Sequence, residues 1–118
     1  MDLRLLSDEG NVLRLEMVGP TVQSDQTPDL KPFEDLLGPR GYTRNVLVGL
    51  SDITLIDSRC LSWLLIIHKR FCQAGGRLVV HSIRPQVMEI LQVARFERVL
   101  YIGEDEAAAL EVLQRKDP

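Results

Sequence analysis

Hydrophobic and polar positions alternate near the start of the chain, and this pattern gives way to longer apolar runs further along. Alternation over residues 2–6 and 12–18, with turn-forming residues at 7–11 between them, predicts an antiparallel hairpin whose second strand is half-buried. Gly19-Pro20 ends that strand, and a polar stretch over 21–32 precedes a short helix expected over 33–37, with Pro32 at its first turn. Residues 46–50 form a continuous apolar run, which is typical of a strand covered on both faces.

Helices and strands are expected to alternate from residue 53 to the end of the chain. Residues 53–56 lead into a long helix over 59–74, which Gly75-Gly76 ends, and a strand follows over 77–82. A helix opens at Pro85, and its apolar residues are three and four positions apart, at Val87, Ile90, Leu91 and Ala94. A strand over 99–102 and a last helix behind the acidic residues 104–106, with Leu110 and Leu113 facing inward, complete the order.

Strands that are separated by helices pair in parallel through right-handed crossovers. We therefore predict an α/β fold, in which a mixed, mostly parallel sheet begins with the N-terminal β-hairpin and carries about four helices. A chain of 118 residues has room for one domain, here residues 1–118, with a core over about 3–113 and a frayed tail at 114–118.

The charge and the cysteine content narrow the class of partner. Lysine and arginine number 14 against 17 aspartate and glutamate, a net charge of −3, which disfavours both a nucleic-acid partner and a polybasic membrane surface. No apolar run approaches the roughly 20 residues that span a bilayer, and the N-terminus lacks the pattern of a signal peptide. Because two cysteines make no disulfide framework, we expect a cytoplasmic protein that acts on proteins or small molecules.

The junction of Asp57 and Ser58 is the most informative point for function. In open α/β sheets, function gathers where strands end and helices begin, because helix N-termini present unpaired N–H groups. Either residue can cap the helix, and if Asp57 does so the Ser58 hydroxyl is left free at the positive end of the helix dipole. A phosphate is tolerated there, but a simple helix cap is the interpretation that spacing alone favours.

Catalytic and metal sites are poorly supported. Ser58 and Asp57 with His68 or His81 resemble a hydrolytic triad in composition, but the Gly-x-Ser-x-Gly sequence is missing. His68 and Cys72 have the spacing of a metal pair, although we expect their helix face to be core. We therefore predict that the chain is not an enzyme and holds no metal or cofactor.

The long helix has apolar residues on more than one face. The stripe expected to face the sheet consists of Leu61, Leu64, Leu65, His68, Phe71 and Cys72. Trp63 and Ile66 fall off this stripe, with Ile67 at its margin. Either neighbouring elements cover Trp63 and Ile66 or the two form an exposed protein-binding patch, and the sequence leaves both alternatives open.

Residues 46–58, the leucine-rich helix, the segment 74–80 and the helix start at 85–91 closely resemble the STAS domain family, and most of all its stand-alone bacterial anti-sigma factor antagonists. The resemblance implies a partner switch without a cofactor, in a monomer or weak dimer. An anti-sigma factor with serine-kinase activity would phosphorylate Ser58, and a serine phosphatase would reverse the reaction. The partner-binding residues it implies are Asp57, Ser58, Arg59, Cys60, Leu61 and Ser62, to which the helix pattern adds Trp63 and Ile66.

One departure from the family pattern supports an alternative. Arg59-Cys60 stand where the family has a small residue followed by glycine, and this adds bulk beside Ser58. The alternative is a STAS scaffold or interaction subunit of a larger signalling or transport complex, which is never phosphorylated.

Overall fold

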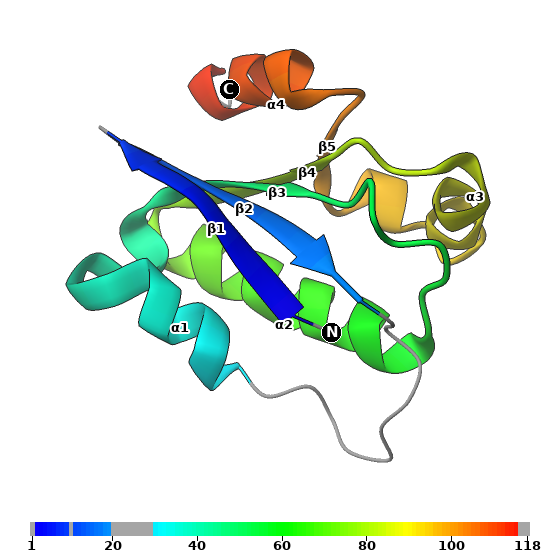
Figure 1. The fold of residues 1–118 in the computed structure, drawn as a ribbon, viewed down its shortest axis with the longest axis horizontal. Coiled ribbons are helices and arrows are strands. Elements are labelled where there is room, and N and C mark those ends of the chain that lie inside the picture. The colour runs from blue at the N-terminus through cyan, green and yellow to red at the C-terminus, as the bar shows by residue number, and fades with distance from the viewer. Residues whose placement is uncertain (1, 10, 20–29, 116–118) are drawn as a thin grey trace.

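The computed structural model describes residues 2–9, 11–19 and 30–115 of the chain (Figure 1). Its strands are β1 (Asp2–Glu9), β2 (Val12–Val18), β3 (Asn45–Gly49), β4 (Arg77–His81) and β5 (Tyr101–Gly103). The α-helices in this part of the chain are α1 (Lys31–Leu37), α2 (Ser58–Ala74), α3 (Pro85–Val93) and α4 (Glu106–Gln114). Two 3₁₀ helices, η1 (Gly38–Thr43) and η2 (Phe96–Arg98), complete the set.

The five strands form one sheet in the order β1-β2-β3-β4-β5. The hairpin β1–β2 is antiparallel and every other pair is parallel, which confirms the predicted α/β fold class. The buried apolar residues form two clusters, one on each face of the sheet. Leu13, Val46 and Leu78 are aligned across β2, β3 and β4 and belong to the larger cluster, the larger core. Leu47 and Val79, one position later, belong to the smaller core under α4. Helices α1 and α2 therefore cover one face of the sheet and α4 covers the other (Figure 1).

The N-terminal hairpin confirms the predicted alternation in β2, whose residues are in turn half-buried and buried. Strand β1 is longer than predicted, because Ser7, Asp8 and Glu9 pair with β2 after an irregularity between Leu5 and Ser7. Polar residues are tolerated in these positions because β1 is an edge strand with solvent on one side. The end of β2 before Gly19 agrees with the prediction, whereas most of the polar stretch 21–32 lies outside the described residues.

The other element bounds differ from the predictions by a few residues. Helix α1 begins at Lys31 rather than residue 33, with Pro32 in its first turn as predicted. Strand β5 begins at Tyr101 rather than residue 99, because the amide of Leu100 closes a turn onto the carbonyl of Phe96 at 2.8 Å. In α3, Val87 and Leu91 are buried and Ile90 is half-buried as expected. The prediction for Ala94 is wrong, because α3 ends before it and its side chain is exposed.

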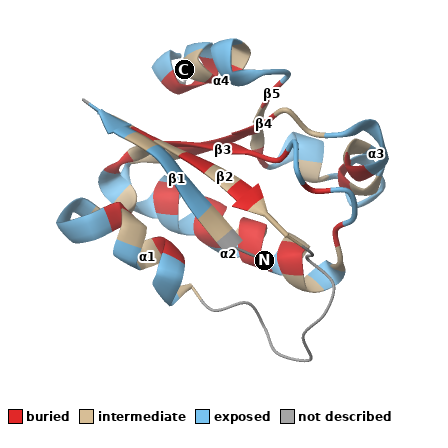
Figure 2. Ribbon diagram, viewed as in Figure 1, coloured by how far each residue is buried: buried red, intermediate tan, exposed pale blue. Residues whose placement is uncertain are grey.

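The face of α2 that packs on the sheet differs from the predicted stripe by about one position (Figure 2). Its buried residues are Cys60, Trp63, Leu64, Ile67, His68 and Phe71. Phe33 of α1 covers one flank of the helix, with its ring centroid 5.4 Å from that of Trp63 in an edge-to-face contact. The opposite flank is correspondingly more open: Leu61 and Leu65 are half-buried and Cys72 is exposed, against the prediction.

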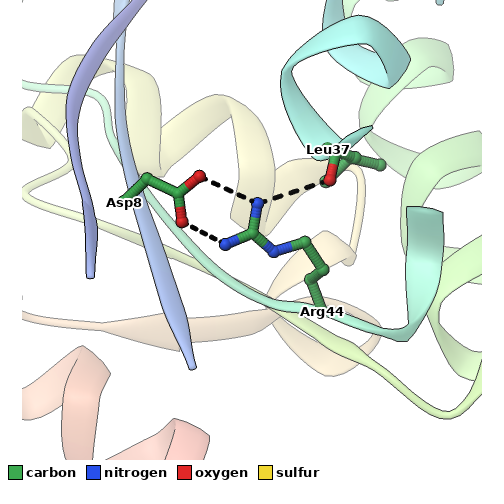
Figure 3. A network of polar contacts seen from close by, with 3 residues as sticks. All are labelled: Asp8, Leu37 and Arg44. Atoms are coloured by element: carbon green, nitrogen blue, oxygen red, sulfur yellow. Dashed lines mark hydrogen bonds and ion pairs between the residues drawn. The ribbon is translucent and has the colours of Figure 1, made fainter. Parts of the chain in front are cut away.

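Arg44 joins three elements at the end of the sheet where β3 begins (Figure 3). Its guanidinium donates to both carboxylate oxygens of Asp8 on β1 and to the carbonyl of Leu37 at the end of α1. The hydrogen bond from Arg44 is the main reason why the pKa of Asp8 lies below its ordinary value of 3.8. This contact holds α1 and the hairpin to β3 at the end opposite the start of α2.

Candidate functional site

The segment between β3 and α2 is irregular but anchored along its length. The amide of Leu50 donates to the carbonyl of His81 at 3.0 Å, and the amide of Ile53 donates back to Leu50 at 3.0 Å. Ile53 and Ile56 are buried in the larger core, while Arg84 from the β4–α3 connection donates to the carbonyl of Ser51 at 2.6 Å. The segment therefore presents the start of α2 from a fixed position at the carboxyl ends of the parallel strands.

Asp57 is the cap of α2, as one of the two capping alternatives predicted. Its backbone is extended, and its Oδ1 accepts a hydrogen bond from the amide of Cys60 at 3.0 Å. Its carbonyl accepts the first helical hydrogen bond, from Leu61, at 3.0 Å. Because the cap is a different residue, the hydroxyl of Ser58 is not needed to begin the helix.

Ser58 is the first residue of α2, and its side chain is exposed. Within the described residues its hydroxyl makes no hydrogen bond, so it is open to chemistry from solvent. The amides of the first turn of a helix point outward and carry the positive end of its dipole, so they favour an anion at this position. The site therefore combines an accessible hydroxyl with an electrostatic environment that accepts a phosphate.

Two of the residues expected to bind a partner do not reach the surface. Cys60 is 1% exposed, and burial, with a smaller contribution from Asp57, raises the pKa of its thiol to about 12. At neutral pH this thiol stays protonated and is not a nucleophile. Trp63 is also 1% exposed, and Phe33 of α1 packs on its indole, so a neighbouring element covers this residue. Ile66 is 37% exposed, so the same alternative does not hold for it.

The remaining predicted residues do form a surface around Ser58. Ser62 and Ile66 are exposed on the outer face of α2, while Arg59 and Leu61 are half-buried on its two flanks. Sequence reasoning missed Leu55, whose side chain is 53% exposed just before the cap. It also missed Val93 of α3, which is 86% exposed and lines a groove together with Leu61. One feature of the sequence could have identified Val93: it is an apolar residue that does not share the buried apolar face of its own helix.

The two histidines do not form a catalytic group with Ser58. His68 lies ten residues further along α2, about 15 Å at 1.5 Å per residue, and its Nε2 is 3.6 Å from Sγ of Cys72. Burial lowers its pKa below the ordinary 6.5. His81 lies on the α4 side of the sheet, with its Nδ1 2.8 Å from the hydroxyl of Ser82. Among residues 2–9, 11–19 and 30–115, no three potential metal ligands come together.

The profile of the STAS domain matches residues 7–109. The chain belongs to the STAS domain family. It is 31% identical over 84 residues to a proposed anti-sigma factor antagonist of Thermotoga maritima, covering 71% of this chain and 73% of the relative. A similarly described protein of Thermotoga neapolitana is 32% identical over 82 residues, covering 70% and 71%.

Two solved structures share the fold of this STAS domain. One is the crystal structure of the Thermotoga maritima protein TM1081, with a TM-score of 0.69, 20% identity and coverage of 97% of this chain and 94% of the other. The second is a STAS domain protein of Planctomyces limnophilus, with a TM-score of 0.72, 20% identity and coverage of 95% and 98%. None of the helices in the described part of the chain is both long enough and apolar enough to span a bilayer.

Proposed function

We propose that this STAS domain is an anti-sigma factor antagonist, whose binding to an anti-sigma factor with serine-kinase activity is controlled by phosphorylation of Ser58. The observation that carries the proposal is the exposed Ser58 hydroxyl at the first position of α2, left open because Asp57 caps the helix. The names of the Thermotoga relatives support the same role. The unmodified chain binds the anti-sigma factor and so releases the sigma factor.

The modification is a phosphoryl transfer that this chain receives and does not catalyse. The Oγ of Ser58 attacks the γ-phosphorus of ATP held by the kinase, ADP leaves, and the hydroxyl proton passes to a base of the kinase. A serine phosphatase hydrolyses the ester, which restores the hydroxyl and releases inorganic phosphate. Both reactions need an accessible Ser58, which its position at the surface supplies.

The phosphate changes binding without changing the fold. It adds about −1.5 to −2 charges at a helix start, where the dipole favours them, so α2 remains intact. The apolar side chains of Leu55 and Leu61 lie close by in sequence and are at least partly exposed. A partner that covers these side chains must also dehydrate the phosphate, which is costly, so the phosphorylated chain is released.

The experiment compares baits that differ at Ser58 and at an exposed residue near the other end of the same helix. Wild type, Ser58→Ala, Ser58→Asp and Gln73→Asp are used to capture partners from the source organism, and phosphorylated sites on the recovered baits are mapped. Gln73 is the control because it is exposed on α2 but lies outside the predicted partner-binding residues. We expect Ser58→Asp alone to lose the kinase, Ser58→Ala to keep it without acquiring phosphate, and all four to melt alike. Equal capture by Ser58→Asp and wild type refutes the switch.

A non-phosphorylated scaffold is the second candidate, and two observations favour it. The half-buried Arg59 adds bulk immediately after Ser58, and Ile66 leaves apolar surface exposed on α2. Size-exclusion chromatography with light scattering separates the two candidates. Stable self-assembly, or a permanent partner that is not a kinase, supports the scaffold, whereas a monomer that accepts phosphate from ATP through a kinase excludes it.

A further inference from the structure

Strand β1 forms one edge of the sheet, and within residues 2–9, 11–19 and 30–115 its only strand neighbour is β2 (Figure 1). The backbone N–H and C=O groups on its outer side therefore have no strand to pair with in this part of the chain. Natural edge strands are often protected by a lysine or a proline, and β1 contains neither. It exposes apolar surface instead, since Leu5 is 50% exposed and Leu6 is 51% exposed. The edge is thus open to the addition of another strand.

The two charged residues Arg4 and Glu9 lie on the same face of β1. Three residues of β1 are paired with three residues of β2 that stand two positions apart: Arg4 with Glu16, Ser7 with Arg14, and Glu9 with Val12. Residues two apart in a strand point to one face, and residues directly opposite one another share that face. Val12 packs against the smaller core, so this is the face that carries α4. In a regular strand Arg4 and Glu9 would be on opposite faces, and the irregularity at Leu6 is what brings them together.

Both charges can reach a second molecule. Helix α4 packs chiefly on β3, β4 and β5, whereas β1 lies at the edge of the sheet beyond β2. The side chain of Arg4 is 62% exposed and is 3.5 Å from the carboxylate of Glu16, an exposed ion pair of the kind that contributes little to stability. Glu9 is exposed and makes no ion pair within the described residues. Each side chain therefore has room for an ion pair across the edge.

We propose that two copies of this chain associate by antiparallel pairing of their β1 strands. A two-fold axis perpendicular to the sheet keeps its two faces distinct, so residues that oppose one another come from the same face. Three positions of the axis pair five or more of the residues that β1 aligns with β2: Arg4, Leu5 and Ser7. At Arg4 the axis opposes this arginine to itself, and at Leu5 it leaves Arg4 opposite Ser7. At Ser7 it places Arg4 of each copy opposite Glu9 of the other, which forms two ion pairs. The charges thus favour a second copy of this chain, in the register centred on Ser7.

The association is weak and reversible. Five residues of each strand pair in this register, and the irregularity at Leu6 interrupts the ladder. The contact is therefore well below the roughly 1,600 Å² of a standard stable interface, and we expect a Kd of about 10 µM to 1 mM. The two copies of Leu6 adjoin the axis and lose exposed apolar surface, which favours pairing. Ser58 is not among the residues that pair, so the dimer does not rest on the proposed function.

Charge reversal on each side of the contact tests the pairing by sedimentation equilibrium, from about 10 µM to about 1 mM protein. Arg4→Glu and Glu9→Arg each set like charges against one another at both contacts, so each should raise the Kd at least about tenfold. An equimolar mixture of the two variants restores opposite charges at both contacts and should associate with a Kd within about threefold of wild type. Lys69→Glu and Glu89→Arg are the matched controls, because they change the net charge by the same amounts at exposed positions of α2 and α3 and should keep the Kd of wild type.

The mixture also guards against a trivial loss of folding, because two misfolded variants would not restore each other. Wild type that sediments as the 13.4 kDa monomer up to about 1 mM overturns the proposal. Association that both β1 variants retain places the interface elsewhere on the molecule and overturns it as well. Variants that are monomeric alone and in the mixture, with the melting temperature of wild type, exclude the pairing of Arg4 with Glu9. Since Ser58 is intact in every sample, none of these results bears on the phosphorylation switch.

Discussion

Replacing Trp63 tests the assignment of this residue to the core. Its side chain is 1% exposed and packs edge-to-face on Phe33 at 5.4 Å. Trp63→Ala should lower the free energy of unfolding by about 3–5 kcal/mol, a value that includes the roughly 0.5–1.5 kcal/mol of the aromatic pair. Ile66→Ala, three residues later on the same helix, removes a side chain that is 37% exposed and should cost about 1 kcal/mol or less.

A third variant separates the packing of the ring from its polar group. The indole N–H of Trp63 is buried and finds no acceptor among the described residues. Trp63→Phe loses volume but also removes this N–H, whose burial costs about 1–3 kcal/mol, so its stability should stay within about 1 kcal/mol of wild type. Urea unfolding followed by far-ultraviolet circular dichroism gives all three values without relying on the single tryptophan. If Trp63→Ala proves as stable as Ile66→Ala, the indole lies at the surface and its role in partner binding is open again.

The other predictions concern the helix caps and the titrating groups. Asp57→Ala and Asp105→Ala each remove one cap hydrogen bond, and each should lower the free energy of unfolding, measured by thermal denaturation, by about 1 kcal/mol. Only Asp57→Ala should also reduce capture of the kinase, and equal losses of capture in the two variants would contradict this. Because the pKa of Asp8 is lowered, its stabilising contribution should be present above pH 3.8 and be lost as the pH falls through its folded pKa; melting temperatures of wild type and Asp8→Asn should therefore converge in acid. Because burial lowers the pKa of His68, the unfolded chain takes up the proton first, so stability should decline below about pH 6.5, and His68→Gln should show a shallower decline.

The sheet could be predicted from the sequence because its signals are local. Alternation in β2, the apolar run of β3 and the Gly75 stop after α2 each lie within one element, and parallel pairing follows from the helices between the strands. The sequence predicts a turn from residue 7, whereas in the structure residues 7–9 still belong to β1. The prediction is wrong there because a bulged edge strand accepts polar residues, so its composition resembles that of a turn.

The rotation of α2 could not be predicted, because two apolar stripes one position apart fit its sequence almost equally well. The choice between them depends on Phe33, which lies thirty residues earlier and packs on Trp63 and Phe71. The groove beside Leu61 has no local signal either, since it exists only through the placement of α3 against α2. At the candidate site the sequence identified the two capping alternatives, and the hydrogen bond from Cys60 to Asp57 decided between them.

The contrast between the two cysteines makes the domain suitable for site-specific labelling. Cys60 is buried and protonated, whereas Cys72 is exposed near the far end of α2. A maleimide dye should therefore attach to Cys72 alone, fourteen residues and about 21 Å along the helix from Ser58. A fluorescent reporter can thus be carried on the same rigid helix as the acceptor serine while leaving that serine untouched.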